Sequence, residues 1–117
     1  MSTVTIWHNP RCSKSREALA LLEETGTEAD IVKYLEETPS ENEIRDVLKK
    51  LGIGARDLMR TKEDLYKELG LREVDDEEKL IAAMAANPKL IERPVVIMGD
   101  KAVIGRPPEK VVEFIKG

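Results

Sequence analysis

The sequence predicts an α/β fold, because short β-branched runs alternate with segments of helical periodicity. Two such runs near the start of the chain enclose one helical segment, and two more lie close together near its end. The 117 residues suffice for one compact core and are too few for two comfortable domains. We therefore expect residues 1–117 to form a single domain.

The first part of the chain has the pattern of a βαβ unit. Val4–His8 is the first predicted strand, Asn9-Pro10 ends it with a turn signal, and Asp30–Leu35 is the second strand. The helical pattern between them covers residues 13–26 and ends on a glycine. Such a crossover nearly always joins parallel strands. Cys12 therefore lies at the N-terminus of the first helix.

The middle of the chain is predicted to be helical. Ser40 opens a capping box ahead of an apolar stripe, and Gly52 ends that helix. Two more helical stretches follow, a broken one over residues 57–69 and a clearer one from Asp75 to the Asn-Pro pair at 87–88.

Strands return near the end of the chain. Pro94–Met98 and Ala102–Ile104 flank the turn Gly99-Asp100 as a hairpin, and Pro107-Pro108 suits the first turn of a last helix. The order is that of a thioredoxin-like fold with helices inserted between the second and third strands. Such folds are similar in placing a cis-proline where Arg93-Pro94 stands, although only about 5–6% of X-Pro bonds are cis.

The composition excludes several classes of protein. The 19 basic and 23 acidic residues leave a net charge of -4, which does not favour nucleic acid as a partner. No apolar run approaches the ~20 residues of a membrane helix, and Met1–Thr5 lacks the basic flank and apolar stretch of a signal peptide. We expect a cytoplasmic protein with no membrane partner.

Cys12 is the single cysteine, so its thiol is either a packing residue or reacts with partners from outside the chain. A helix N-terminus stabilises a thiolate through its unpaired N–H groups and the helix dipole, which lowers the thiol pKa. Ser15 can offer its hydroxyl to the sulfur, and Arg11, Lys14 and Arg16 surround it with positive charge. This context favours a reactive thiol.

Other polar residues are candidates for the same site. His8, the single histidine, either polarises the thiolate or is a hydrogen-bonded residue at a strand end. One histidine and one cysteine make a poor metal site, because structural zinc takes four ligands. Three arginines suit a tetrahedral oxyanion, since a guanidinium offers two donors at once and keeps its charge. These are Arg60, Arg93 and Arg106, of which Arg60 by itself is typical of a solvated surface residue.

The sequence lacks two known motifs that bind phosphate groups. A loop of the low-molecular-weight tyrosine phosphatase type requires arginine six positions after its cysteine, where this chain has Ala18. Gly52-Ile53-Gly54 begins a dinucleotide fingerprint, but Asp57 stands in place of the third glycine and no strand precedes it.

The segment His8–Arg16, with the sequence HNPRCSKSR, resembles the active-site segment of ArsC-type, glutaredoxin-linked arsenate reductases. The likeness covers nearly the whole chain and is greatest to the YfgD-like branch of that family. The further matching segments are Gly26-Thr27-Glu28, Tyr34-Leu35-Glu36, Leu58-Met59-Arg60, Tyr66-Lys67-Glu68-Leu69-Gly70, Asn87-Pro88, Glu92-Arg93-Pro94-Val95-Val96 and Ile104-Gly105-Arg106-Pro107-Pro108.

The resemblance implies a role for each candidate residue. Cys12 is the nucleophile, and the three arginines bind the oxyanion. His8 and Ser15 support the thiol without reacting themselves. The implied steps are attack of the Cys12 thiolate on arsenate, attack of glutathione on the adduct, and reduction of the mixed disulfide by glutaredoxin as arsenite leaves. Glutathione is then a co-substrate, and no cofactor is bound.

The residues give independent support for one of these steps. Because the chain has no second cysteine, an external thiol is required to resolve Cys12. Two rival functions stay open, a glutathione-dependent thiol oxidoreductase acting on another substrate and a regulatory binding protein similar to the Spx-type transcriptional regulators. Those regulators bind RNA polymerase and often sense oxidants through Cys-x-x-Cys, whose second position is Ser15 here.

Overall fold

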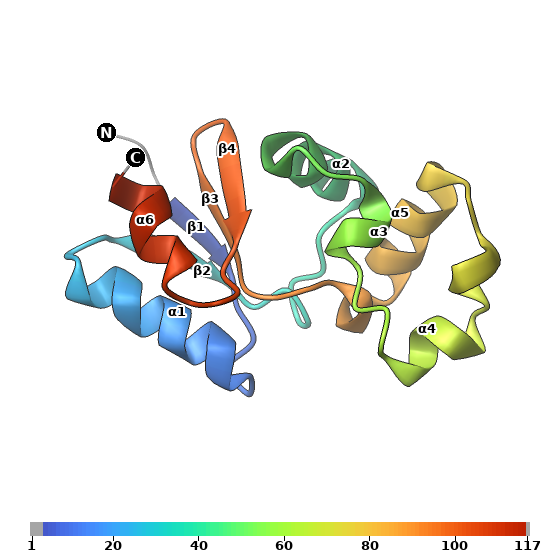
Figure 1. Ribbon diagram of the computed structural model, residues 1–117, viewed down its shortest axis with the longest axis horizontal. Helices are drawn as coiled ribbons and strands as arrows, with labels where there is room; N and C mark the ends of the chain where they lie inside the picture. The colour runs from blue at the N-terminus through green and yellow to red at the C-terminus, as the bar shows by residue number, and fades with distance from the viewer. Residues whose placement is uncertain (1–3, 117) are drawn as a thin grey trace. The chain divides into compact units, whose positions relative to one another are not determined.

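The computed structural model describes residues 4–116 and divides into two compact units (Figure 1). The sheet unit comprises the chain up to residue 37 and again from residue 93, and the helical unit comprises residues 38–92. Residues 1–3, which belong to the segment Met1–Thr5 that was expected not to be a signal peptide, lie outside the described residues. The predicted helical insertion between the second and third strands is confirmed.

The sheet unit contains one four-stranded mixed sheet in the order β2-β1-β3-β4. The strands are β1 (Val4–Trp7), β2 (Ala29–Val32), β3 (Val95–Met98) and β4 (Lys101–Ile104). β1 pairs with β2 in parallel and with β3 antiparallel, and β3 pairs with β4 antiparallel. This is the thioredoxin-like arrangement that the element order predicts.

The strand directions define an edge of the sheet that matters for function. β1, β2 and β4 run in the same direction, so their carboxyl ends lie at one edge, and β3 begins at that edge. We call it the carboxyl edge. The residues that follow β1, β2 and β4 and that precede β3 therefore come together although they are far apart in sequence.

Two helices cover one face of the sheet. α1 (Ser13–Glu24) and α6 (Lys110–Lys116) lie side by side there (Figure 1). Their buried side chains meet those of the strands in one apolar core, which removes their surface from water. The core residues are Val4, Ile6, Ala18, Leu22, Val96 and Val111.

The strand ends in the sheet unit shift slightly from prediction, and two boundaries differ most. β2 ends at Val32, short of the predicted Leu35, because the N–H groups of Glu36 and Glu37 bond to the carbonyl of Lys33 and close a turn. α6 begins at Lys110, so the proline pair precedes the helix and does not form its first turn.

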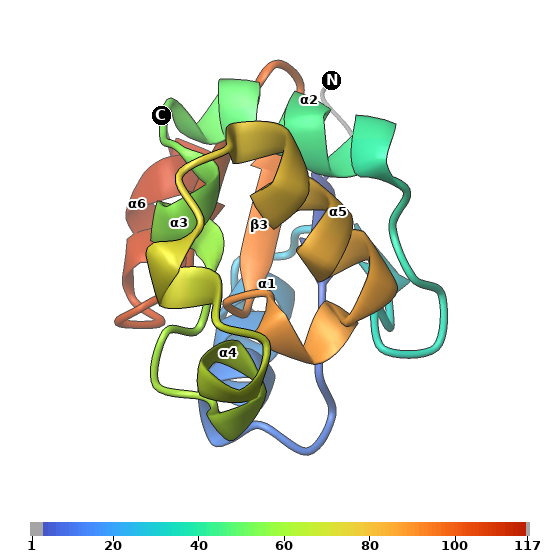
Figure 2. The ribbon, with the colours of Figure 1, turned by 90° about the vertical axis from the view of Figure 1, so that its right-hand side faces the viewer.

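The helical unit consists of four α-helices and two short 3₁₀ helices (Figure 2). Both α2 and α3 pack against α5. The bounds are α2 Glu41–Leu51, α3 Ala55–Leu58, α4 Asp64–Glu68, η1 Leu71–Glu73, α5 Glu77–Ala86 and η2 Pro88–Leu90.

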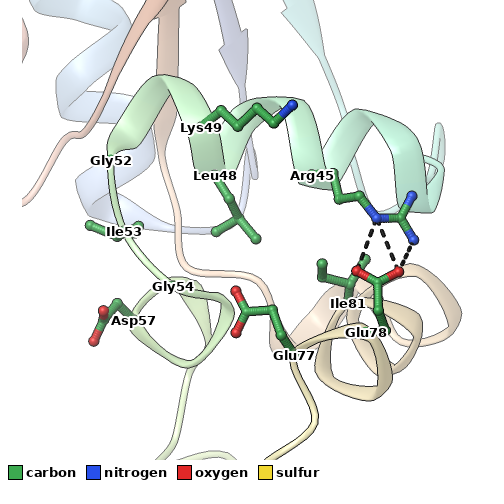
Figure 3. A pocket seen from close by; sticks show the side chains of 10 residues that line it. All are labelled: Arg45, Leu48, Lys49, Gly52, Ile53, Gly54, Asp57, Glu77, Glu78 and Ile81. Atoms are coloured by element: carbon green, nitrogen blue, oxygen red, sulfur yellow. Dashed lines mark hydrogen bonds and ion pairs between the residues drawn. The ribbon is translucent and has the colours of Figure 1, made fainter.

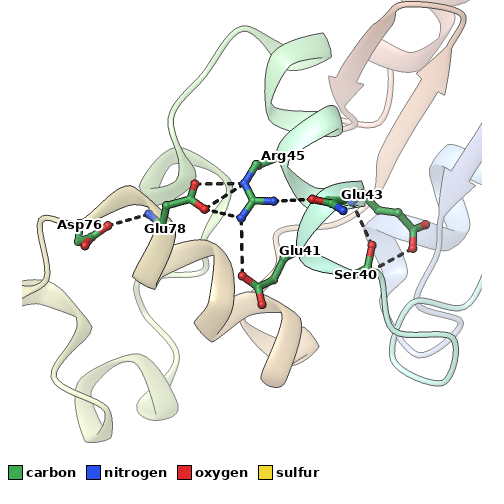
Figure 4. Close-up of polar contacts among 7 residues, drawn as sticks. Ser40, Glu41, Glu43, Arg45, Asp76 and Glu78 are labelled. Atoms are coloured by element: carbon green, nitrogen blue, oxygen red, sulfur yellow. Dashed lines mark hydrogen bonds and ion pairs between the residues drawn. The ribbon is translucent and has the colours of Figure 1, made fainter.

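The ends of α2 follow from local sequence signals. The Ser40 hydroxyl accepts the Glu43 N–H at 3.1 Å, and the Glu43 carboxylate accepts the Ser40 N–H (Figure 4). Gly52 ends the helix with a φ of 70°. Arg45 then links α2 to α5, since its Nε donates to both Glu78 oxygens at 3.1 Å. The predicted capping box and C-cap are confirmed.

The broken pattern over residues 57–69 resolves into two short helices, α3 and α4. Between them Met59 forms an antiparallel bridge with Ile91, and the Arg60 N–H donates to the carbonyl of Leu90 at 2.7 Å. These contacts with a distant segment end α3 after one turn. The N-cap of α5 is Asp76, one residue beyond the predicted Asp75.

Candidate active site

The loop between β1 and α1 is built around Asn9. Its Oδ1 accepts the Arg11 N–H at 3.0 Å, its carbonyl accepts the Cys12 N–H at 3.0 Å, and its own N–H donates to the Ser15 hydroxyl at 3.0 Å. Asn9-Pro10 was predicted only as the turn that ends the first strand, without a part in holding the thiol loop. An asparagine before a proline is a turn signal of this kind, so the sequence did contain a pointer to it.

Cys12 is the N-cap residue of α1, and the residue is 9% exposed. Burial raises the pKa of the thiol, but the Ser15 N–H, the charge and hydrogen bond of Arg93, and the Lys14 N–H all favour the thiolate. Their combined effect lowers the pKa below its ordinary value of 9.0. The site therefore favours a thiolate in a largely buried position.

Arg106 also faces the sulfur. Its Nη2 donates to Cys12 Sγ at 3.7 Å, and its Nε donates to the Arg93 carbonyl at 2.8 Å. The bond to the Arg93 carbonyl fixes the orientation of the Arg106 guanidinium relative to Arg93. Arg93 and Arg106 thus place two permanent positive charges beside the thiol.

The Arg93-Pro94 segment packs closely against the chain that follows β4. The Arg93–Pro94 peptide bond is cis, and the Gly105 N–H donates to the Pro94 carbonyl at 2.9 Å. A Cβ on Gly105 would lie 2.9 Å from Pro94 Cγ and 2.9 Å from Val111 Cγ2. Only glycine fits at this position without movement of its neighbours.

His8 and Ser15 are both buried, with exposed fractions of 5% and 0%. His8 Nδ1 and Ser15 Oγ are hydrogen-bonded at 2.7 Å. Burial lowers the pKa of His8 from 6.5, and the charges of Lys33 and Arg16 lower it further. The imidazole is therefore neutral at neutral pH. The Ser15 hydroxyl pairs with His8 and Asn9, and Ser15 acts on the sulfur through its backbone N–H.

The sheet unit holds five of the six predicted site residues at or near its carboxyl edge. His8 and Cys12 lie in the loop after β1, and Ser15 lies in α1. Arg93 precedes β3, and Arg106 follows β4.

The sixth predicted residue, Arg60, belongs to the helical unit. There it forms ion pairs with Glu63 and with Glu92, the latter between Arg60 Nε and Glu92 Oε1 at 3.8 Å. Glu63 in turn lies 3.9 Å from Lys89 Nζ.

The helical unit also has an open cavity of about 520 Å³ between α2, α3 and α5 (Figure 3). Three of its charged side chains are engaged, since Arg45 pairs with Glu78 and a Glu77 oxygen accepts the Ala55 N–H at 2.8 Å. Its lining residues are Arg45, Leu48, Lys49, Gly52, Ile53, Gly54, Asp57, Glu77, Glu78 and Ile81. None of the predicted site residues lines it.

Within residues 4–116, no group of three or more His, Cys, Asp or Glu side chains is arranged to hold a metal ion. In the same part of the chain, no helix combines the length and the apolar character needed to cross a bilayer.

Comparison with known proteins finds relatives over nearly the whole chain. Uncharacterized protein YfgD of Escherichia coli K12 is 58% identical to this chain over 114 residues, which are 96% of each protein. Arsenate reductase of Haemophilus influenzae is 52% identical over 115 residues, 97% of this chain and 99% of that protein.

A solved structure extends the likeness to three dimensions. Arsenate reductase from Vibrio cholerae superposes with a TM-score of 0.93 at 51% identity, over 96% of this chain and 97% of that one. The sequence model of the ArsC family matches residues 7–114. The chain is therefore a member of the ArsC family.

Proposed function

We propose that this protein is an arsenate reductase that uses Cys12 as its nucleophile, with glutathione and glutaredoxin as reductants. The observation that carries the proposal is a single thiol whose pKa is lowered in spite of burial, with Arg106 Nη2 at 3.7 Å from its sulfur. Relatives named arsenate reductase at 51–52% identity support arsenate as the substrate.

The first step is attack of the Cys12 thiolate on dihydrogen arsenate, whose two protons leave with the displaced oxygen as water, and the product is a Cys12–S–As(V) adduct. The attack brings two negative species together. Arg93 and Arg106 offset this repulsion, because each keeps its charge and offers parallel N–H donors to the arsenate oxygens. His8 and Ser15 hold the loop that carries the thiol, and the neutral imidazole adds no proton to the leaving oxygen.

The second step is attack of glutathione on the adduct. One Cys12–S–SG bond forms, the S–As bond breaks, and arsenic gains the two electrons that the two thiol sulfurs lose, so arsenite departs. Glutaredoxin then reduces the mixed disulfide. An external resolving thiol fits a chain with one cysteine.

Further parts of the proposal rest on the family resemblance. Arg60 contributes to oxyanion binding, residues 1–117 act as one functional domain, and no cofactor is bound. The location is the cytoplasm, where thiols stay reduced and glutathione is available. No nucleic acid or membrane takes part.

The test is arsenite release from arsenate in the presence of glutathione and glutaredoxin. Cys12→Ser should abolish release without unfolding the protein. Arg60→Lys, Arg93→Lys and Arg106→Lys should each lower kcat/KM for arsenate by about tenfold or more, because lysine keeps the charge but loses the fork of donors.

Arg72→Lys is the matched control, since Arg72 is exposed in η1 and outside the proposed site. It should leave turnover unchanged. Wild-type efficiency in both Arg93→Lys and Arg106→Lys would disprove the oxyanion site. Thiol–disulfide exchange without arsenite release would instead favour a thiol oxidoreductase with another substrate.

A further inference from the structure

We infer that three exposed cations at the carboxyl edge, Arg11, Arg16 and Lys33, form a recognition surface for the carboxylates of glutathione; this inference rests on the proposed function. We call these residues the cationic rim. They lie outside the set of residues that contact arsenic in the proposal. Their role is to select the thiol that resolves Cys12.

The topology brings the rim to the thiol from two sides. The His8 N–H donates to the Val32 carbonyl at 2.8 Å, which holds the end of β2, and hence Lys33, beside the loop that carries Cys12. On the other side, the Arg16 N–H donates to the Cys12 carbonyl at 3.0 Å, and Arg16 Nη1 reaches the Pro10 carbonyl at 3.4 Å.

The charges of Arg16 and Lys33 act at this site. Both lower the pKa of His8, after the larger effect of burial, so both fields reach the buried pair that His8 forms with Ser15. Such fields are only partly screened at the distances found within one site.

The rim cations are also available to a ligand. All three are exposed. Among residues 4–116, Lys33 and Arg16 have no ion-pair partner, and the acidic side chains of Glu36 and Glu37 on the same turn as Lys33 do not pair with it. In contrast, Lys14 lies 3.9 Å from Glu17 and is excluded from the rim.

Glutathione fits this surface better than a protein partner does. Cys12 is only 9% exposed, so the attacking sulfur must belong to a molecule small enough to reach it. Glutathione has two carboxylates and one ammonium group, and it is therefore a net anion whose charges lie on both sides of its sulfur. The rim presents cations on both sides of the Cys12 loop.

The experiment measures thiol–disulfide exchange without arsenate. The Cys12 thiolate attacks a disulfide, a Cys12–S–S bond forms, the original S–S bond breaks and one thiolate leaves. Three probes differ in charge: glutathione disulfide is an anion, bis(2-hydroxyethyl) disulfide is neutral and cystamine is a cation. Second-order rate constants are measured at low ionic strength for the wild type and for Lys33→Glu and Arg16→Glu.

In both variants the rate with glutathione disulfide should fall about fivefold relative to the neutral probe, and the rate with cystamine should rise. Added salt should reduce both differences. Lys101→Glu is the matched control, because Lys101 is an exposed residue at the start of β4, away from the carboxyl edge, and makes the same change in net charge. It should leave the three rates in their wild-type ratio.

Several results would overturn the inference. An equal change for all three probes would mean that the variants alter the thiol itself, and an equal effect of Lys101→Glu would mean that net charge alone is responsible. Slower reduction by glutaredoxin with unchanged exchange rates would assign the rim to a protein partner. The exchange experiment contains no arsenate, so its result does not depend on arsenate reduction. If the protein failed to release arsenite in the separate assay, the proposed function would be wrong, but the measured exchange rates would still test the cationic rim.

Discussion

The thiol of Cys12 is subject to two opposing influences. Burial favours the neutral thiol, and the donors at the start of α1 together with Arg93 favour the thiolate and prevail. Burial is useful for the proposed chemistry because a poorly hydrated thiolate close to fixed donors needs little solvent rearrangement when it attacks.

We predict that Cys12 titrates below 9.0, the ordinary value for its thiol. The rate of alkylation by iodoacetamide against pH should have its inflection below that value, since only the thiolate reacts. Arg93→Gln should move the inflection upward, because it removes a charge and a hydrogen bond that favour the thiolate. An inflection at the ordinary value in the wild type would contradict the activated thiol.

His8 should make stability depend on pH. Its pKa in the folded state lies below 6.5, so between these two values the unfolded chain binds more protons than the folded one. The contribution of His8 to the free energy of unfolding should therefore be complete above pH 6.5. It should be lost as the pH falls through the pKa of His8 in the folded state. Urea unfolding of wild type and His8→Gln over this range checks the prediction.

The difference between those two proteins isolates His8 from the carboxylates that titrate at lower pH. His8→Gln should lack the decrease that begins below pH 6.5. If the two proteins lost stability in parallel, the neutral buried imidazole would be the wrong description.

At the residue scale, the sequence predicted those features of the site that depend on the local course of the backbone. Cys12 was predicted at a helix N-terminus because a strand, a turn and a helical pattern surround it, and the structure has it as the N-cap of α1. The bond between His8 and Ser15 was not predicted, since it depends on how the loop folds over seven residues. The cis state of Arg93–Pro94 likewise has no local sequence signal.

At the scale of elements, boundaries that depend on a cap were predictable and boundaries that depend on distant contacts were not. Ser40 and Gly52 bound α2 through side-chain and left-handed backbone geometry that short motifs encode. The division between α3 and α4 is set by the bridge from Met59 to Ile91, more than thirty residues away. No local pattern contains that information.

The close packing of Gly105, which lies between β4 and α6, leads to a prediction at the scale of elements. Gly105→Ala should lower the free energy of unfolding by about 1–3 kcal/mol, because the new methyl group overlaps Pro94 and Val111. It should also lower turnover, since Arg106 follows directly and its Nε is bonded to the Arg93 carbonyl. Urea unfolding and the arsenite assay measure the two effects.

A double variant tests the cause. Val111→Ala removes one of the two overlapping atoms, so Gly105→Ala should cost less stability in that background than in the wild type. Strictly additive losses would mean that the overlap is relieved in another way.

At the scale of the whole molecule, the proposed cycle predicts one trapped covalent state. With arsenate and glutathione present and glutaredoxin withheld, the intact protein should gain the mass of one glutathione on Cys12, because the chain has no second cysteine to resolve it. Supplying glutaredoxin should remove the added mass. Intact-mass spectrometry follows both changes.

The control without arsenate separates turnover from adventitious oxidation of a reactive thiol. Ser15→Cys should decrease the adduct by offering an internal partner, provided that the two sulfurs reach bonding distance. Arsenite release without any glutathionylated protein would mean that another thiol resolves Cys12.

The order of elements and the membership of the sheet unit were predictable from periodicity, since each strand and α1 carry their own pattern. The meeting of the site residues required a further fact, the directions of the four strands. The helical unit, residues 38–92, was predicted as an insertion, but its short helices and its cavity depend on packing that the sequence pattern does not specify.

The carboxyl edge has a consequence for how such a protein changes during evolution. The nucleophile loop, the turn with Lys33, the segment before β3 and the segment after β4 are four separate peptides attached to one unchanged sheet. A substitution in one of them can change the attacking atom, the preferred co-substrate or the anion bound while the strands keep their pairing. New specificities can therefore accumulate one segment at a time without loss of a folded ancestor.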